Sequence, residues 1–276
     1  MEMKNLKKGL VVVAGLALLT IGLAGCSNSS DNSVKNIKDK GTLVMGTSAD
    51  YAPFEFPIVK NGKKTVTGYD IFIAQQIAKD MGVKLKITNT EFPSLITDLK
   101  NKKVDIVLAG MVSTDERKKQ VSFSDSYYKV ENVLLVNKAD ENKYNSISDL
   151  KGLQVGAQQT TTQEQIAKKQ IKNATTVTEA NANSLTTELT QGKLAGVVLE
   201  NEIADNYVKQ YPEKYAIAKN VKLSTPESQQ HINIAVRKDD KKLLKQVNKS
   251  VKELKSNGKM DTFLAKAQNL QAKYGK

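Results

Sequence analysis

Hydrophobic and polar positions in the first half of the chain alternate between short apolar runs and amphipathic stretches. Ile73, Ile77 and Met81 recur at four-residue spacing, which is typical of the buried face of a helix, and Gly82 supplies a stop. The elements that this pattern predicts are strand 42–48, helix 69–82, strand 83–88, helix 92–102 and strand 104–110. This βαβ order indicates parallel strands with helices on both faces of the sheet.

The second half of the chain repeats the alternation and ends in lysine-rich amphipathic segments. Its predicted elements are strands 133–137, 153–157, 175–180 and 196–200, helices 160–171, 183–192 and 201–210, the apolar run 232–238 and amphipathic segments near 240–255 and 259–270. In open parallel sheets, ligands bind at the carboxyl ends of the strands. We therefore expect function in the segments that follow those ends, which are 49–56, 110–117, 157–164 and 200–202.

One of these segments carries an arginine in a lysine-rich chain. A buried strand ends in Gly110, and "STDER" follows shortly after it. Ser113 and Glu116 have the spacing of a capping box, which places Arg117 one turn into a helix, at the end that attracts anions. Arg237 in "AVRKDD" has the features of a stray surface arginine, so we expect Arg237→Lys to change nothing.

Length and composition favour a folded body of two lobes. The chain has 276 residues, which suits two lobes of about a hundred residues each better than one core. Its net charge is +13, carried by scattered lysines, and such a charge suits a position beside anionic membrane and wall polymers. No nucleic-acid-binding module accompanies this charge, so we expect no nucleic-acid partner.

The N-terminal segment is typical of a secretory signal. Lys4, Lys7 and Lys8 precede an apolar run over 9–25 that ends in small residues. A membrane-spanning helix is the alternative interpretation, although this run is at the short limit for crossing a bilayer.

The end of that run, "LAGC", resembles the bacterial lipobox, in which cleavage leaves Cys26 as an N-terminus that carries lipid such as palmitate. We therefore expect a lipoprotein signal peptide over 1–25 and a lipid-anchored flexible tether over 26–36. Cys26 is the only cysteine, which excludes a disulfide within the chain and a cysteine-based zinc cluster. The expected location is the extracytoplasmic face of the cell membrane, in a Gram-positive bacterium.

Four stretches of the chain, in this order, resemble landmarks of the solute-binding proteins of polar amino-acid ABC transporters, the family 3 solute-binding proteins. They are "YAPFEF", "GYDIFIAQQIAKDMG", "LKNKKVDIVLAGMVSTDERKKQVSFSDSYY" and "VGAQQTTTQEQIA". The resemblance implies the type II periplasmic-binding-protein (Venus flytrap) fold, with two doubly wound α/β lobes joined by two crossover strands. Lobe 1 would comprise 37–127 and 232–276, lobe 2 would comprise 132–228, and the hinges would lie near 127–131 and 228–232.

The resemblance also implies how a ligand carboxylate is held. Arg117 suits it because a planar guanidinium offers two parallel charge-assisted bonds. Thr161 matches a threonine that grips the carboxylate from lobe 2, although Thr160 stands where the family has glycine. Val112 replaces a common Ser or Thr, so it would contribute only its backbone N–H.

The ligand ammonium has two expected partners. Glu200 matches a family aspartate and is one methylene longer, while Gly110 would offer its carbonyl oxygen. Asp70 has the features of a helix cap and is a less attractive candidate.

The ligand side chain is expected to lie between two aromatic rings. Tyr51 and Phe92 match the rings that sandwich the ligand in the family. Ser48 occupies a place where binders of cationic or amide side chains often have aspartate, and its lack of charge argues against a dedicated arginine binder. Asp50 or Glu91 could supply the missing charge. We expect a free polar amino acid, with glutamine or another amide first and cationic amino acids next.

The function that follows is capture of a free amino acid between the lobes and its delivery to an ABC permease and its ATPase, by a monomer without cofactor or metal. One alternative is an enzyme on the same scaffold, resembling a dehydratase. The only histidine, His231, has no nucleophile or acid partner in the sequence, so we expect no catalysis. A surface adhesin or sensor is the other alternative.

Overall fold

The computed structural model of the protein describes residues 31–274. The expected signal peptide over 1–25, the lipidation site Cys26 and the first part of the tether lie outside these residues. Residues 31–276 form a compact unit of their own. Within the described part of the chain, no helix is both long and apolar enough to cross a membrane.

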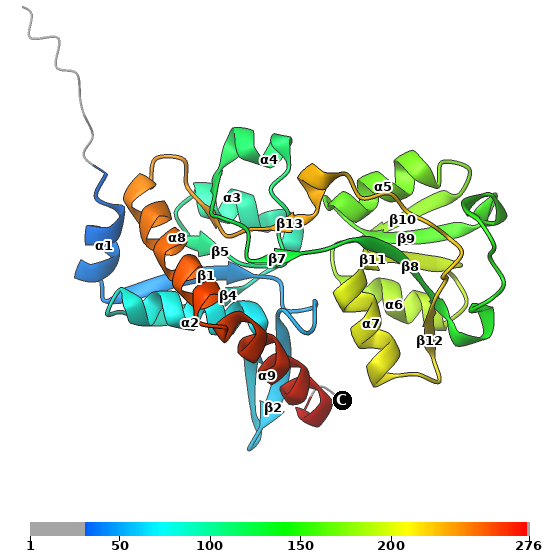
Figure 1. Ribbon diagram of the computed structural model, residues 1–276, viewed down its shortest axis with the longest axis horizontal. Helices are drawn as coiled ribbons and strands as arrows, with labels where there is room; N and C mark the ends of the chain where they lie inside the picture. Colours follow the sequence, from blue (N-terminus) through cyan, green and yellow to red (C-terminus); the bar gives the residue numbers. More distant parts are fainter. Residues whose placement is uncertain (1–30, 275–276) are drawn as a thin grey trace, which may run out of the picture. The chain divides into compact units, whose positions relative to one another are not determined.

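Lobe 1 is built on a five-stranded sheet with the strand order β4-β1-β5-β14-β6 (Figure 1). Its strands are β1 (Thr42–Thr47), β4 (Lys84–Asn89), β5 (Ile106–Val107), β6 (Ser122–Phe123) and β14 (Ala235–Val236). Its helices are α1 (Ser33–Asp39), α2 (Tyr69–Asp80), η1 (Phe92–Ser94), α3 (Leu95–Lys100), α4 (Asp115–Gln120), α8 (Lys241–Ser256) and α9 (Lys259–Tyr274). Helices α2 and α3 both pack on β1, while α8 and α9 pack on α2, so the last segments of the chain complete the first lobe.

Lobe 2 is built on a second five-stranded sheet, with the order β10-β9-β11-β8-β12. Its strands are β8 (Asn132–Asn137), β9 (Gln154–Gln158), β10 (Thr175–Glu179), β11 (Gly196–Glu200) and β12 (Tyr215–Ile217). Its helices are η2 (Lys138–Asp140), η3 (Ile147–Leu150), α5 (Thr162–Gln170), α6 (Ala182–Thr190) and α7 (Asn201–Gln210). The two sheets confirm the expected pair of α/β lobes.

Both sheets are mixed rather than wholly parallel. In lobe 1, β4, β1 and β5 run parallel, whereas β14 is antiparallel to β5 and β6. In lobe 2, β10, β9 and β11 run parallel, whereas β8 is antiparallel to β11 and β12. The expectation of parallel strands is therefore wrong at β8 and β14, because these strands enter their sheets from the crossing segments rather than through a βαβ connection.

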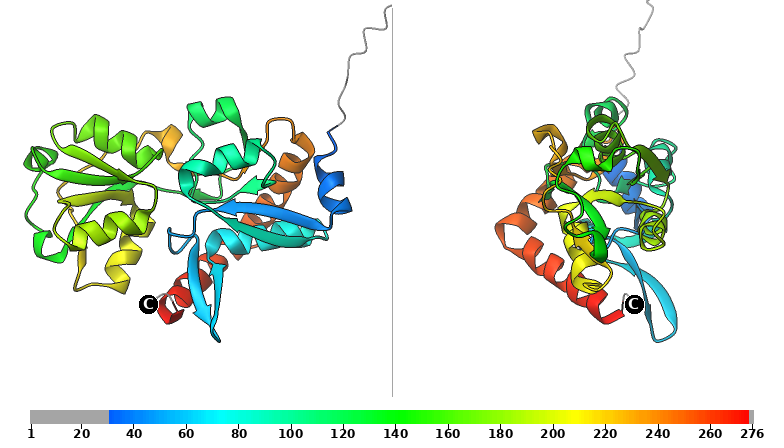
Figure 2. Two further views of the ribbon diagram at one scale, coloured as in Figure 1. Left: turned by 180° about the vertical axis from the view of Figure 1, so that it is seen from behind. Right: turned by 90° about the vertical axis from the view of Figure 1, so that its right-hand side faces the viewer.

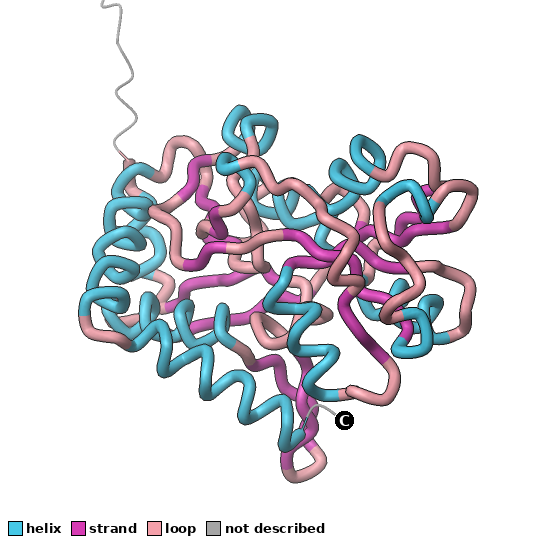
Figure 3. Tube along the Cα trace, turned by 45° about the vertical axis from the view of Figure 1, so that its right-hand side comes forward, coloured by secondary structure: helices cyan, strands magenta, loops and turns pink. Residues whose placement is uncertain are grey.

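Two short strands run between the lobes and pair with each other. β7 (Tyr128–Lys129) is antiparallel to β13 (His231–Ile232), and η4 (Glu227–Gln229) precedes β13. β7 and β13 are labelled between the lobes in Figure 1, and Figure 3 draws the strands in magenta. We call β7 and β13 the hinge strands because they lie where the hinges are expected. Rotation of the lobes about them stays a prediction.

A helix and a hairpin are among the parts of lobe 1 that were not expected from the sequence. Helix α1 begins at Ser33, inside the predicted tether, because Asp31 accepts a hydrogen bond from the Ser33 backbone N–H at 2.9 Å and Ile37 is buried beneath the helix. The hairpin of β2 (Phe56–Lys60) and β3 (Lys63–Thr67) packs beside α9 (Figure 2).

Candidate ligand-binding site

One cavity is lined by segments from both sheets, and it contains every binding residue named from the sequence. They are Ser48, Tyr51, Phe92, Gly110, Val112, Arg117, Thr161 and Glu200. All the space between its walls, open solvent included, amounts to about 310 Å³. That these residues bind a ligand stays a prediction.

Helix α4 starts one residue later than the expected capping box. Its N-cap is Thr114, whose side-chain oxygen accepts the backbone N–H of Arg117 at 3.3 Å. The predicted cap at Ser113 is wrong because Thr114 is the last residue in extended conformation before the helix. Arg117 still lies in the first turn of α4.

The Arg117 side chain is buried and bonded only to neutral groups. Its Nη1 donates to the carbonyl oxygen of Val112 at 2.7 Å, and its Nη2 donates to the carbonyl oxygen of Thr160, from lobe 2, at 2.9 Å. The guanidinium carbon lies 5.1 Å from the centre of the Phe92 ring. Burial lowers the pKa of Arg117 to about 10, so the side chain stays charged at neutral pH. Among residues 31–274, the ion pairs of arginine all belong to Arg237.

The turn before α5 keeps a backbone shape that favours glycine. Thr160 has a φ of 63°, in the left-handed region that β-branched residues avoid. Thr161 is the N-cap of α5: its hydroxyl accepts the backbone N–H of Glu164 at 3.2 Å and donates to the carbonyl oxygen of Gln158 at 2.6 Å. The N-terminus of α5, which favours anions, therefore faces the cavity together with Arg117.

Glu200 is a buried acid with an incomplete set of donors. It ends β11 and is 2% exposed. Gln163 Nε2 donates to its Oε1 at 3.2 Å, whereas its Oε2 meets no donor from the described residues. Burial raises the pKa of Glu200 to about 8, against the lowering effect of the hydrogen bond from Gln163 and of the Arg117 charge. A positively charged ligand group would supply the partner that Glu200 lacks.

Asp50 brings a carboxylate to the cavity beside the uncharged Ser48. The Ser48 hydroxyl donates to Asp50 Oδ1 at 2.7 Å. From lobe 2, Gln158 Nε2 and the backbone N–H of Ala182 donate to Oδ2 at 3.2 and 2.6 Å. Glu91 is exposed, so of the two acids considered beside Ser48 only Asp50 lines the cavity.

Asp70 is not the helix cap that the sequence indicates. The N-cap of α2 is Gly68, while the Asp70 side chain is fully buried and accepts the backbone N–H of Gly110 at 3.0 Å. Gly110 has a φ of 54°, and a Cβ atom there would lie 3.1 Å from the Tyr51 ring. Glycine is therefore required where the loop passes the ring.

The remaining residues that line the cavity were not expected from the sequence. They are Glu55, Ala109, Gln158, Thr162 and Gln163. All but Ala109 belong to segments 49–56 and 157–164, so position after a strand end was the available signal. No cluster of His, Cys, Asp and Glu within residues 31–274 is arranged to hold a metal ion.

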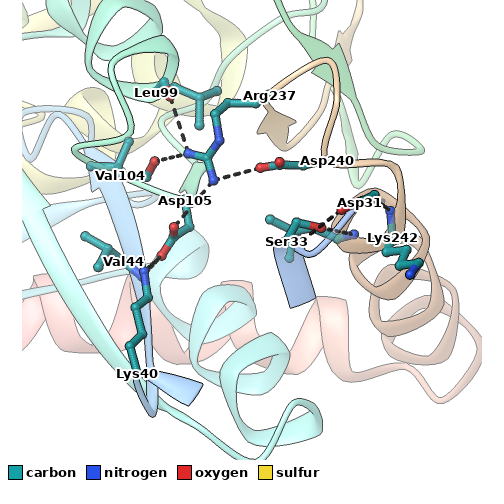
Figure 4. Close-up of polar contacts among 11 residues, drawn as sticks. Asp31, Ser33, Lys40, Val44, Leu99, Val104, Asp105, Arg237, Asp240 and Lys242 are labelled. Atoms are coloured by element: carbon teal, nitrogen blue, oxygen red, sulfur yellow. Dashed lines mark hydrogen bonds and ion pairs between the residues drawn. The ribbon is translucent and has the colours of Figure 1, made fainter. Parts of the chain in front are cut away.

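Arg237 lies outside the cavity and is not a stray surface residue (Figure 4). Its Nη1 donates to the carbonyl oxygen of Val104 at 2.6 Å. Its Nη2 lies 2.7 Å from a carboxylate oxygen of Asp240 and 3.5 Å from one of Asp105. The expectation that Arg237→Lys changes nothing does not fit this network, because a lysine has one nitrogen to meet all three partners.

Comparison with known proteins places the chain in a family. Residues 43–269 match the bacterial extracellular solute-binding proteins, family 3. The arginine-binding extracellular protein ArtP of Bacillus subtilis is 36% identical over 95% of this chain and 98% of ArtP. An amino-acid ABC transporter substrate-binding protein from Streptococcus pneumoniae, solved with L-arginine, superposes with a TM-score of 0.83 at 36% identity, covering 86% of this chain and 98% of that chain.

A third relative bears on the enzyme alternative. The ancestral amino acid-binding protein AncCDT-1, a precursor of cyclohexadienyl dehydratase, has a TM-score of 0.76 at 35% identity, covering 85% of this chain and 98% of that chain. All three relatives are named as binding proteins, in agreement with the expectation of a non-catalytic function. By its sequence and by its two-lobed fold, the chain belongs to the bacterial extracellular solute-binding proteins, family 3.

Proposed function

We propose that the protein captures a free amino acid with a cationic side chain, arginine first, and delivers it to an ABC permease and its ATPase. The arrangement of charge in the cavity carries this proposal. Within residues 31–274, Arg117 forms no ion pair with an acid, and Asp50 and Glu200 form none with a base. A ligand carboxylate complements Arg117, and the two cations of the ligand complement Asp50 and Glu200.

The proposed preference among ligand side chains, cationic before amide, reverses the order that was expected from the uncharged Ser48. A zwitterionic ligand with an amide side chain would leave the acids of the cavity in excess, whereas a guanidinium adds one more positive charge. Asp50 lies beside Ser48 and supplies the charge that Ser48 lacks. The arginine named for ArtP and bound in the Streptococcus pneumoniae structure supports the same order.

Each ligand group has proposed partners. Arg117, the N-terminus of α5 at Thr161 and the backbone N–H of Val112 bind the carboxylate, and Glu200 with the Gly110 carbonyl binds the ammonium. The side chain extends between Tyr51 and Phe92 toward the carboxyl groups of the cavity. The Phe92 ring also lies against the Arg117 guanidinium, so it orients the Arg117 side chain as well as the ligand.

Attachment to the membrane belongs to the proposal as well. Cys26 after "LAGC" would carry the lipid and keep the protein beside its permease. Cys26→Ser should release the protein from membranes without unfolding it, because residues 31–276 form a separate unit. Fractionation of cells tests this, and a variant that remains membrane-bound would favour an uncleaved spanning helix.

The central test is a calorimetric comparison of arginine, lysine, glutamine and glutamate on protein beginning at Ser27. We expect arginine to bind most tightly, glutamine more weakly and glutamate not at all, since glutamate adds a negative charge to an acidic cavity. Thermal unfolding gives an independent measure, because a ligand that binds the native state raises the melting temperature. Binding of sugars or peptides and of no amino acid would overturn the proposed function.

A further inference from the structure

Asp70 connects the cavity with one of the hinge strands. The hydroxyl of Tyr127 donates to the two carboxylate oxygens of Asp70 at 2.8 and 2.9 Å, and the backbone N–H of Gly110 donates to Asp70 Oδ2 at 3.0 Å. Tyr127 directly precedes β7, and Gly110 lines the cavity. One buried carboxylate therefore links a cavity residue to a residue 17 positions later, at the crossing between the lobes.

Glu55 is a second buried acid beside the same carboxylate. It is fully buried, and its two oxygens meet no hydrogen-bond donor from the described residues. Burial and the adjacent Asp70 raise the pKa of Glu55 well above its usual range. Burial raises the pKa of Asp70 to about 6, and the hydrogen bonds from Gly110 and Tyr127 act to lower it.

The other hinge strand holds the same part of the cavity wall. We call residues 110–112 the ligand loop. Val112 forms a β-bridge with Ile232 of β13, and the backbone N–H of Asn233 donates to the carbonyl oxygen of Met111 at 3.0 Å. The backbone N–H of Tyr127 donates to the carbonyl oxygen of Ile232, also at 3.0 Å. The ligand loop is therefore fixed to both hinge strands, by backbone bonds on one side and by Asp70 on the other.

We propose that Asp70 is a positioning residue that couples the ligand loop to the hinge strands through Tyr127. Rotation of the lobes moves Tyr127. The hydrogen bonds from the Tyr127 hydroxyl make the Asp70 carboxylate move with it, and the Gly110 peptide, which is bonded to Asp70, moves as well. A ligand that fixes the Gly110 carbonyl therefore stabilises one setting of the hinge. This inference rests on the proposed function, because Gly110 is assigned there to the ligand ammonium.

Tyr127→Phe tests the coupling, and Tyr69→Phe is its matched control. Both variants lose one hydroxyl from the same buried aromatic cluster, in which the two rings lie 5.9 Å apart. The Tyr69 hydroxyl lies 3.4 Å from the Tyr127 carbonyl oxygen and 3.3 Å from Met260 Sδ, so its bonds bypass Asp70. We expect Tyr127→Phe to weaken arginine binding about tenfold through faster dissociation, and Tyr69→Phe to stay within about twofold. Equal effects in the two variants would overturn the inference.

Asp70→Asn keeps the shape of the side chain and removes its charge. Because Tyr127 acts through Asp70, the double variant should bind arginine no more weakly than Asp70→Asn alone. Losses that add in full would show that the two residues act independently and would overturn the coupling. If Asp70→Asn does not fold, the pair of tyrosine variants decides.

Hydrogen exchange separates this inference from the proposed function, since it needs no ligand. In Tyr127→Phe the amides of the ligand loop should exchange about tenfold faster than in Tyr69→Phe, because Asp70 is no longer held. Wild-type protein that binds no amino acid would overturn the proposed function, while the exchange rates would still decide the coupling. Equal amide exchange rates of the ligand loop in Tyr127→Phe and Tyr69→Phe would overturn the coupling.

Discussion

Arg117 and Arg237 place the same side chain in opposite electrostatic surroundings. The guanidinium of Arg117 meets two carbonyl oxygens and an aromatic ring. That of Arg237 meets one carbonyl oxygen closely and two carboxylates, and Asp105, one of the two, also pairs with Lys40 at 2.5 Å. Both side chains are largely or wholly withdrawn from water, so the contrast lies in the charge of their partners.

This contrast distinguishes Arg117, the proposed partner of the ligand carboxylate, from Arg237, whose contacts are structural. The charge of Arg237 is neutralised within the protein, and its network joins the α3–β5 connection to the segment after β14. Within residues 31–274 the Arg117 guanidinium forms no ion pair, and it lines a cavity to which both lobes contribute. Burying a positive charge without an anionic partner lowers the stability of the folded protein, and an anionic ligand group offsets part of that loss.

Arg117→Lys should have the largest effect on binding, although it keeps the charge. Loss of one partner from a buried, hydrogen-bonded charge pair costs about 2 to 5 kcal/mol. At about 1.4 kcal/mol per decade, the affinity for arginine falls on the order of thirty-fold or more, less what a single lysine bond recovers. Titration calorimetry measures the loss. Equal affinities in wild type and variant, both folded by circular dichroism, would make Arg117 a helix residue without a binding role.

Arg237→Lys should give the reverse result. Its affinity for arginine should match wild type, because Arg237 lies outside the cavity. Its free energy of unfolding should fall by about 1 to 3 kcal/mol, since one ammonium leaves buried acceptors among Val104, Asp105 and Asp240 unsatisfied. Denaturant titration measures this loss. A variant as stable as wild type would remove the structural half of the comparison.

The pH dependence of binding examines Glu200, the acid opposite Arg117. Burial raises its pKa to about 8. In the proposed site the ligand ammonium pairs with the ionised form. Below that pKa the ligand must displace a proton, so affinity should rise with pH, by about fivefold from pH 7 to pH 8, and level off above. Arg117, with a pKa of about 10, stays charged over this range. In Glu200→Gln the affinity should be lower and flat with pH; a wild-type profile that is already flat would exclude Glu200 as the titrating partner.

The fold could be predicted where local pattern and packing agree. Helix α2 was expected over 69–82 and spans Tyr69–Asp80, and β11 was expected over 196–200 and spans Gly196–Glu200. The β2–β3 hairpin was overlooked although its signal was present. Asn61 and Gly62 have φ values of 52° and 73°, as in the tight turns that Asn-Gly favours between two strands.

The candidate site could be predicted only as far as position after a strand indicates it. Which acids become buried depends on contacts between distant segments. Asp70 has the local pattern of a capping residue, but its side chain is directed by Gly110 and Tyr127, which are 40 and 57 positions away. Arg237 looked unremarkable for the same reason, since Val104 and Asp105 approach it only in the folded lobe.

Thr160→Gly should have the smallest effect and examines the lobe 2 partner of Arg117. A left-handed conformation costs a non-glycine residue about 1 to 2 kcal/mol. Glycine recovers this but loses roughly 0.5 to 1 kcal/mol more backbone entropy on folding. The variant should therefore be more stable by about 0.5 to 1 kcal/mol, seen as a rise in melting temperature of about 2 to 4 °C per kcal/mol. Arginine affinity should change by less than about twofold, because the bond from Arg117 uses only the carbonyl oxygen of residue 160.

Lys102→Gly is the matched control, since Lys102 has a similar φ of 60° on an unbranched, exposed residue away from the cavity, where less strain is released. A Thr160→Gly protein that is less stable than wild type, or that loses affinity as Arg117→Lys does, would mean that the threonine side chain itself holds the turn against Arg117.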